Sequence, residues 1–262
     1  MAKLIGGLKI IGKIGNLSCY QLPGSDKVYV RSKSGPSSHK YKTSPKFAGS
    51  RRQNSEFTGA SKSASRVNHG LGEVKLLRTG NIYPDLVRFT GKIQKMDTVS
   101  KGGQRAVLFS SFGKLLDGFN INQTYSFDSI LRYPLTFSIS RETMTASVEI
   151  PDLIPGFNFY PDKNQSLYRL RVAFIMLPDL VFGKYGYQPI VDISLLPKEI
   201  ATDWHTAIQK SEATSLSVSL PYSPEVNSGL LLSIGIEYGV QLENGDVKRV
   251  LKAGSGKILA VR

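Results

Sequence analysis

The chain has 262 residues, of which 40% are hydrophobic and 21% are charged, and its 34 Lys and Arg against 20 Asp and Glu give a formal net charge of +14. These fractions are ordinary for a globular protein, so they exclude a wholly disordered chain and a fibrous repeat. A chain of this length can bury a sizeable core, as one large β-rich domain or as two smaller domains.

The positive charge is concentrated in the first third of the chain. Residues 1–80 hold 15 Lys and Arg and 3 Asp and Glu, a net charge of +12. Residues 81–262 hold 19 Lys and Arg and 17 Asp and Glu, a net charge of +2. This asymmetry predicts a basic arm or face that meets an acidic partner, such as nucleic acid, an anionic surface or an acidic protein.

A single cysteine and the lack of long apolar runs restrict the class of protein further. Cys19 alone allows neither an internal disulfide framework nor a cysteine-based zinc site. Lys and Gly interrupt the apolar N-terminal residues, so we find no signal peptide, and no run of about 18 apolar residues predicts a transmembrane segment. We therefore expect a cytoplasmic protein, with a virion or another assembly as the second setting.

Residues 1–46 are predicted to form a basic, Gly-rich arm. Residues 4–32 fit a β-hairpin or short meander, because turn residues at 23–26 precede an alternating strand at 27–31. A lone hairpin is marginal in water, so this one should pack on the body or on another chain. Residues 32–46 are basic and Ser-rich, and we expect them to be an extended, mobile linker unless they are bound.

Two helices are predicted in residues 47–119. The first follows Ser44, a good N-cap, and ends near Gly70. Apolar side chains at helical spacing mark its buried face, namely Phe57, Ala60, Ala64, Val67 and Leu71. The second helix spans about residues 84–96, and residues 105–119 fit either a buried strand or a helix.

Residues 120–262 are predicted to form the body, an antiparallel β-sandwich. Short alternating segments between turn residues are typical of this architecture, and Asn244-Gly245 is the best hairpin signal. The strands that we expect are residues 133–140, 143–150, 167–177, 189–196, 214–220, 229–241, 247–252 and 257–262. The core residues that we expect are Phe137, Ile139, Val148, Ile150, Val172, Phe174, Ile234 and Ile236. The predicted fold class is therefore α+β, mainly β.

The motifs that could carry chemistry are weak. Residues 7–14 nearly match a phosphate-binding loop, but Ile14 stands where a hydroxyl should meet magnesium, so a glycine-bearing strand is the better interpretation. The three histidines have no spacing that places two of them on one metal ion. Asp203-Trp204-His205 has no partnered nucleophile, and Trp204 is expected to anchor a loop on the sandwich. We predict that the protein is not an enzyme and has no catalytic residue, cofactor or metal ion.

A basic segment is the strongest functional signal. Within 22 residues that contain no acid, seven Lys and Arg residues are interleaved with aromatic residues. Such a pattern is typical of nucleic-acid arms, but no DNA- or RNA-binding motif accompanies it. The alternative is a solvated linker, or a segment that docks on an acidic neighbouring subunit. The candidate partner- or nucleic-acid-binding residues are Arg31, Lys33, Lys40, Lys42, Lys46, Arg51, Arg52, Tyr29 and Tyr41.

Several stretches carry a family likeness. Residues 12–33 open with Gly-Lys-Ile-Gly-Asn-Leu and close with Val-Arg-Ser-Lys, and residues 45–57 contain a Pro-x-Phe…Arg…Asn…Glu-Phe pattern. Two further stretches carry the likeness, namely Gly-Phe-Asn at 118–120 and the Gly-Ile-Glu-Tyr…Asn-Gly hairpin at 235–245. In these stretches the chain resembles an uncharacterised family of hypothetical proteins that is frequent in Bacteroidota. The resemblance implies a bacterial, cytoplasmic protein with a β-rich body, and it brings no activity, cofactor or catalytic residue.

Three functional hypotheses follow. The first is a non-enzymatic structural or interaction protein that forms a homo-oligomer, or docks on an acidic protein, through its N-terminal arm. The second is nucleic-acid binding or packaging, as in a coat protein. The third is a carbohydrate- or ligand-binding sandwich with aromatic side chains in its loops, for instance Tyr160, Tyr185, Tyr187 or Trp204.

Overall fold

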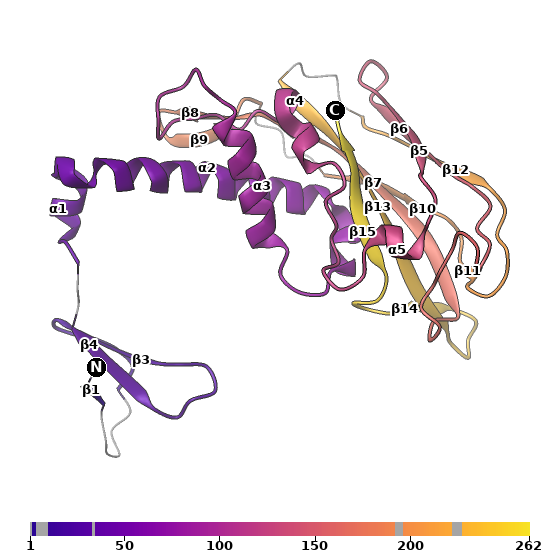
Figure 1. Cartoon of the computed structure of the whole chain (residues 1–262), viewed down its shortest axis with the longest axis horizontal. Coiled ribbons are helices and arrows are strands. Elements are labelled where there is room, and N and C mark those ends of the chain that lie inside the picture. Colours follow the sequence, from indigo (N-terminus) through magenta and orange to yellow (C-terminus); the bar gives the residue numbers. More distant parts are fainter. Residues whose placement is uncertain (1, 4–9, 33–34, 192–195, 222–226) are drawn as a thin grey trace. The chain divides into compact units, whose positions relative to one another are not determined.

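A computed structural model gives the fold of the chain (Figure 1). The residues that it describes are 2–3, 10–32, 35–191, 196–221 and 227–262. The chain forms two compact units, Met1–Arg51 and Arg52–Arg262. Its named strands pair in antiparallel sheets, and the fold is α+β and mainly β, as the sequence predicts. None of the described helices is long and apolar enough to cross a membrane.

A small sheet opens the N-terminal unit. Its strands, in the order β1-β4-β3-β2, are β1 (Ala2–Lys3), β4 (Val28–Ser32), β3 (Leu17–Gln21) and β2 (Gly12–Ile14). The turn between β3 and β4 includes Gly24, whose φ of +76° is a left-handed conformation that glycine adopts without strain. Buried Val28 and Val30 alternate along β4 with more exposed neighbours, as predicted. Residues 4–9 of the predicted hairpin lie outside the described residues.

The prediction that residues 32–46 form an extended linker is wrong, because this segment contains a helix. Helix α1 spans Ser38–Thr43, and the 3-10 turn η1 (Pro45–Phe47) follows it. The Ser37 hydroxyl accepts a hydrogen bond from the backbone N–H of Lys40 at 3.2 Å. This bond satisfies an N–H of the first turn that has no partner within the helix, so a short polar segment can still be helical.

Both predicted helices are present. Helix α2 spans Ala48–Gly70, and helix α3 spans Tyr83–Lys95. The Ser44 side chain makes no capping bond, because η1 intervenes between it and α2. After α2 the chain enters a left-handed conformation at Gly72 (φ +55°), which ends the helix where the sequence predicts. Phe57 is an exception to the predicted buried stripe, since 63% of it is exposed.

Residues 105–119, which the sequence pattern assigned to either a buried strand or a helix, contain both strand pairing and helix. Val107 forms an isolated β-bridge with Leu180, and helix α4 (Phe109–Phe112) and the 3-10 helix η3 (Gly113–Leu116) follow it. Two further short helices are η2 (Gly72–Leu77) and α5 (Phe127–Ile130).

Two long strands, β7 (Leu167–Pro178) and β13 (Ser228–Gln241), are the centre of the larger unit. They pair antiparallel from Leu167↔Gly239 to Pro178↔Ser228. The strands that complete this six-stranded sheet are β10 (Lys198–Ala201), β11 (His205–Thr206), β14 (Val247–Arg249) and β15 (Ser255–Val261). The turn between β13 and β14 contains Asn244-Gly245, as predicted.

A three-stranded sheet and a hairpin complete the body. The sheet contains β5 (Thr136–Ser140), β6 (Thr145–Ile150) and β12 (Thr214–Ser219), and the hairpin joins β8 (Leu180–Gly183) to β9 (Gly186–Pro189). The strand predicted at residues 189–196 is wrong: β9 ends at Pro189, Ile190 and Val191 are not in a strand, and residues 192–195 lie outside the described part. Pro189 and Pro197 lie at the two ends of this segment, and neither has an N–H to donate to a neighbouring strand. Strand pairing is therefore unfavourable at both ends.

The six-stranded sheet is covered on both faces. A Cβ added to Gly235 on β13 would lie 3.0 Å from Val74 and 2.4 Å from Leu77, so odd-numbered residues of β13 face η2. Because side chains alternate along a strand, even-numbered residues face the other side, where the three-stranded sheet lies (Figure 1). These antiparallel sheets fit the predicted β-sandwich, with a helical layer added to one face.

The core agrees closely with the predicted residues. Six of the eight are at most 2% exposed, namely Val148, Ile150, Val172, Phe174, Ile234 and Ile236. Phe137 and Ile139 pack against the core but are only half-buried. They lie on β5, which is an edge strand of the three-stranded sheet and has a covering strand on one side alone.

Candidate functional site

The N-terminal unit has a very small hydrophobic core. Among the described residues, its buried cluster consists of Cys19, Val28 and Val30. Other apolar side chains of this unit are between 45% and 64% exposed, namely Ile11, Ile14, Leu17 and Leu22. A unit that buries so little apolar area gains little stability from its own packing, so these side chains are available to pack on another surface.

Aromatic rings on β3 and β4 stack on each other. Tyr20 lies opposite Tyr29 in the strand register, and their ring centroids are 5.9 Å apart. The guanidinium of Arg31 lies 5.4 Å from the centroid of the Tyr20 ring, while Arg31 itself stays exposed. Of the two predicted binding residues on β4, Arg31 therefore presents a cation to solvent, and Tyr29 is half-buried in ring packing.

Three predicted lysines lie on α1 and η1. Lys40 and Lys42 on α1 and Lys46 on η1 are all exposed. Tyr41 does not stand beside them as a free stacking platform, because its ring packs on Phe47 with centroids 5.5 Å apart. The segment thus offers cations to a partner more readily than it offers an aromatic face.

The other predicted binding residues have different surroundings. Arg51 donates hydrogen bonds from Nη1 to the carbonyl oxygens of Tyr41, at 2.7 Å, and Ser44, at 2.9 Å, so it ties α2 to the preceding turns. Arg52 belongs to the larger unit and packs against Gly103. Lys33 lies outside the described residues.

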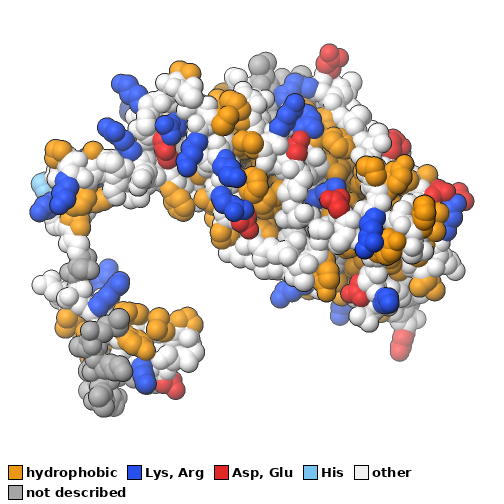
Figure 2. All heavy atoms as spheres, viewed as in Figure 1, with side chains coloured by type: hydrophobic (Ala, Val, Ile, Leu, Met, Phe, Trp, Pro, Cys, Tyr) orange, Lys and Arg blue, Asp and Glu red, His pale blue; other side chains and the backbone are white. Residues whose placement is uncertain are grey.

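The charge of the N-terminal unit is almost entirely positive. Its sequence holds 10 Lys and Arg against a single acid, Asp26, a net charge of +9. No ion pair within the described part of the chain involves Arg31, Lys40, Lys42 or Lys46. Figure 2 shows Lys and Arg side chains on this unit and over α2 and α3, and Asp and Glu side chains mostly over the strands. Clustered like charges repel, and an acidic partner would relieve that repulsion.

The motifs with weak chemical interpretations have structural roles. Cys19 is buried, and Gly12–Ile14 of the near-match to a phosphate-binding loop form strand β2, while residues 7–9 of that segment lie outside the described residues. The ring of Trp204 lies 4.4 Å below the guanidinium of Arg169, and a Cβ on Gly239 would be 2.8 Å from that ring, so Trp204 packs on the sheet as predicted. Within the described ranges, no group of three or more His, Cys, Asp or Glu side chains could hold a metal ion.

The aromatic side chains proposed for ligand binding lie in separate settings. Tyr187 lines a groove of about 570 Å³, but it is 2% exposed and its hydroxyl accepts a hydrogen bond from Gln94 at 3.0 Å. Tyr160 stacks with Arg132 at 3.9 Å, and Tyr185, which is 77% exposed, lies in the turn between β8 and β9. This arrangement gives little support to a carbohydrate-binding interpretation.

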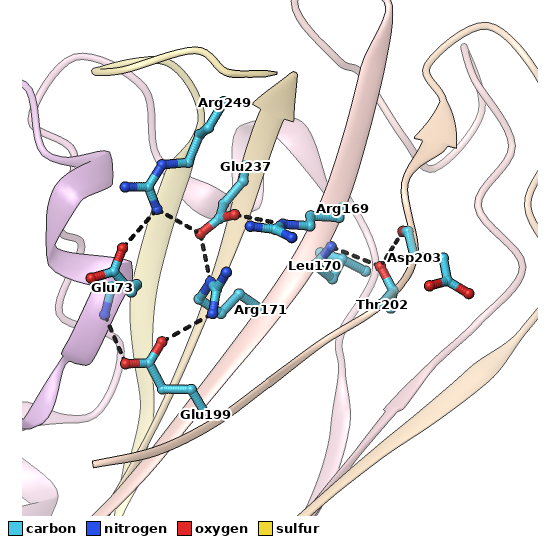
Figure 3. Close-up of polar contacts among 9 residues, drawn as sticks. All are labelled: Glu73, Arg169, Leu170, Arg171, Glu199, Thr202, Asp203, Glu237 and Arg249. Atoms are coloured by element: carbon cyan, nitrogen blue, oxygen red, sulfur yellow. Dashed lines mark hydrogen bonds and ion pairs between the residues drawn. The ribbon is translucent and has the colours of Figure 1, made fainter. Parts of the chain in front are cut away.

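Sequence reasoning missed a charged cluster within the sheet (Figure 3). Glu237 on β13 is fully buried, and its Oε2 and Oε1 accept hydrogen bonds from Nε of Arg169 at 2.7 Å and Nε of Arg171 at 2.6 Å. Arg249 on β14 bridges Glu237, at 3.4 Å, and Glu73 of η2, at 2.9 Å.

A second carboxylate completes this cluster. Glu199 on β10 pairs with Arg171 at 3.1 Å and accepts a hydrogen bond from the backbone N–H of Glu73 at 3.1 Å. Burial alone would raise the pKa of Glu237, but hydrogen bonds from Arg171 and Arg169 outweigh it, and the pKa lies below its usual value of 4.5. Three arginines and three glutamates balance, so the cluster holds η2, β10 and β14 to the central strands and leaves no net charge for a ligand.

The comparisons with known proteins add no relative. No family model matches the chain, and neither the search of curated proteins nor the search of solved structures found a similar protein. The resemblance to hypothetical Bacteroidota proteins therefore stays a prediction.

Proposed function

We propose that the chain is a non-enzymatic interaction protein that self-assembles, with its basic N-terminal unit docking on an acidic protein surface. The observation that carries this proposal is the combination found in residues 1–51. This unit has a net charge of +9, a buried cluster of three side chains and large exposed apolar side chains. Attachment to another surface would both cover the apolar side chains and neutralise the charge.

The strand-built part of the chain offers a suitable partner surface in a second copy. Residues 109–262 have 14 Lys and Arg against 15 Asp and Glu, a net charge of −1. Four loops of this part hold carboxylates, those between β6 and β7, β10 and β11, β11 and β12, and β13 and β14, and the backbone N–H of Asp162 in the first donates to the hydroxyl of Tyr238 on β13 at 3.1 Å. The six carboxylates of these loops are Asp152, Asp162, Asp203, Glu212, Glu243 and Asp246. Two lysines share these loops, Lys163 and Lys210, and Lys210 pairs with Asp152 at 2.6 Å.

Edge strands of the N-terminal sheet support the same proposal. β2 pairs with β3 on one side, and on its other side no described strand pairs with it. An edge of this kind can accept a strand from a neighbour, with main-chain hydrogen bonds adding to the apolar contact of Ile14.

Charge reversal in the arm tests the proposal. We expect the triple variant Lys40→Glu, Lys42→Glu, Lys46→Glu to lose assembly, because three favourable cross-interface charges become repulsive. Sedimentation velocity of the intact and variant chains at about 150 mM salt would measure this. The matched control reverses three exposed lysines of the larger unit, Lys101, Lys184 and Lys198, and should assemble as the unaltered chain does. Equal loss in both variants, or none in the first, would contradict the proposal.

Nucleic-acid binding is the second candidate, favoured by the exposed cations Arg31, Lys40, Lys42 and Lys46. The ring contacts of Tyr29 and Tyr41 within the unit make base stacking less favourable than protein docking. The absorbance ratio at 260 and 280 nm of the gently purified chain separates the two candidates. Co-purified nucleic acid that is released steeply between about 50 and 200 mM salt would favour this second function.

A further inference from the structure

A groove of about 630 Å³ lies between α2 and α3 in the larger unit. Its apolar side chains come from both helices, Phe57 and Ala60 on α2 and Val87 on α3, and Gly91 on α3 opens the space beside them. The helices cross closely here, because the hydroxyl of Thr90 donates to the carbonyl oxygen of Ala60 at 2.8 Å. The groove is therefore preformed by the packing of two well-anchored helices.

The apolar stripe of α2 extends to Phe57, beyond the part of the stripe that the rest of the chain buries. Ala60, Ala64 and Val67 in the same stripe are at most 3% exposed, whereas Phe57 is 63% exposed. Most of the Phe57 side chain therefore stays in water, and covering it with an apolar surface would gain free energy. The stripe is complete only when something apolar lies over Phe57.

The rim of the groove is cationic. Arg88, Lys92 and Lys95 follow one another along α3 at intervals of one helical turn, and Arg105 lies on the rim as well. The carboxylate on this rim is Glu56, which accepts a hydrogen bond from the backbone N–H of Gly103 at 2.7 Å. Two of these cations are already paired, Arg88 with Asp85 at 3.1 Å and Arg105 with Glu56 at 3.9 Å, so Lys92 and Lys95 are the rim cations that a partner would meet.

We propose that this groove binds an amphipathic helix of an acidic protein partner. The apolar face of that helix would cover Phe57 and Val87, and Asp or Glu side chains one turn apart would meet Lys92 and Lys95. Helices of a second copy are poor occupants, because α1 has no acidic residue, and α2 and α3 have one each, Glu56 and Asp85. Apolar side chains from both helices, Phe57, Ala60 and Val87, match the continuous apolar face of a helix, whereas a nucleic acid would use Phe57 alone to stack a base.

The test uses the intact chain and a fluorescent synthetic peptide of about 18 residues, with Leu at i, i+3, i+4 and i+7 and Glu elsewhere. The comparison probes are a peptide of the same composition in scrambled order and an oligo-dT of similar charge. Fluorescence anisotropy should show the amphipathic peptide bound at least about tenfold more tightly than the scrambled one.

Two variants locate the binding. Phe57→Ser and the double variant Lys92→Glu, Lys95→Glu should each weaken peptide binding about tenfold or more. The matched controls, Tyr185→Ser and the pair Lys163→Glu, Lys198→Glu, change equally exposed side chains elsewhere and should bind the peptide as the unaltered chain does. Because Phe57 and both lysines are exposed, these variants should also fold.

Three outcomes would overturn the inference. The first is a scrambled peptide that binds as tightly as the amphipathic one. The second is oligo-dT that binds more tightly than the amphipathic peptide and is weakened by the lysine variant, which would assign the surface to nucleic acid. The third is loss of peptide binding in the arm variant of Lys40, Lys42 and Lys46 but not in Phe57→Ser, which would place the peptide on the arm. The groove lies in the larger unit, whereas the proposed assembly depends on the N-terminal unit. A negative result for peptide binding would therefore leave the assembly proposal untouched, and a negative result for assembly would leave the groove proposal untouched.

Discussion

Replacing Glu237 by Ala should lower the free energy of unfolding by about 3–5 kcal/mol. The substitution removes the Glu237 carboxylate from Arg169 and leaves Arg171 with Glu199 as its remaining carboxylate partner, and both arginine side chains are at most 23% exposed. Removing one partner of a buried ion pair costs more than the pair itself contributes, because the remaining charges stay desolvated. Urea unfolding at neutral pH would measure the loss.

Two comparisons make this prediction sharp. Glu142→Ala removes a glutamate in an exposed turn and should change the stability by less than about 0.5 kcal/mol. The stabilisation also has a defined pH dependence, since the pKa of Glu237 is lower in the folded chain than its usual value of 4.5. It is fully present above that value and is lost as the pH falls through the lower, folded pKa. The difference between the unaltered chain and Glu237→Gln should therefore be largest at neutral pH and shrink in acid; a constant difference would contradict the assigned role.

Replacing Gly254 by Ala should lower the free energy of unfolding by at least about 3 kcal/mol, the second large effect that we expect. Gly254 has φ +89°, and a Cβ there would lie 2.0 Å from the carbonyl oxygen of Ile236. Backbone of a central strand cannot give way as the end of a flexible side chain can. The carbonyl of Gly254 also accepts a hydrogen bond from Asn122 at 2.8 Å, so a shift would break a buried contact as well.

Gly245 is a matched control for this substitution. It has the same φ of +89°, but no heavy atom lies within 4 Å of the position its Cβ would take. Gly245→Ala should thus cost only the strain of a left-handed alanine, about 1 kcal/mol. Thermal or urea unfolding would compare the two variants. Equal stability would contradict the claim that the close approach of β13 requires glycine at position 254.

The sequence predicted those parts of the fold that depend on local patterns. Helical spacing placed α2 and α3, and strand alternation placed β6, β7, β12 and β13 to within a few residues. Helix α1 was missed because a six-residue polar helix has no apolar periodicity, and its cap at Ser37 is a weak signal alone. Phe57 was predicted to be buried because spacing shows which face of a helix is apolar, but not how far the rest of the chain covers that face.

The candidate sites differ in how far the sequence could reveal them. The basic arm was visible in composition, because its charge is a property of neighbouring residues. The Glu237 cluster was not, since it joins β7, β10, β13, β14 and η2, and which residues meet depends on strand register. A partial signal was present: Arg169, Arg171 and Glu237 interrupt strands that are otherwise apolar, which is typical of paired buried charges. The groove between α2 and α3 depends on their crossing, which no linear pattern specifies.

The native mass of the chain with and without residues 1–46 tests the central claim most directly. The larger unit keeps its whole hydrophobic core when these residues are removed, so the shortened chain should fold. We predict that the intact chain forms a complex whose mass is a multiple of 28.8 kDa, and that the shortened chain is a folded monomer. A shortened chain with the oligomeric state of the intact one, or an intact chain that stays monomeric, would contradict the claim that the N-terminal unit serves for attachment.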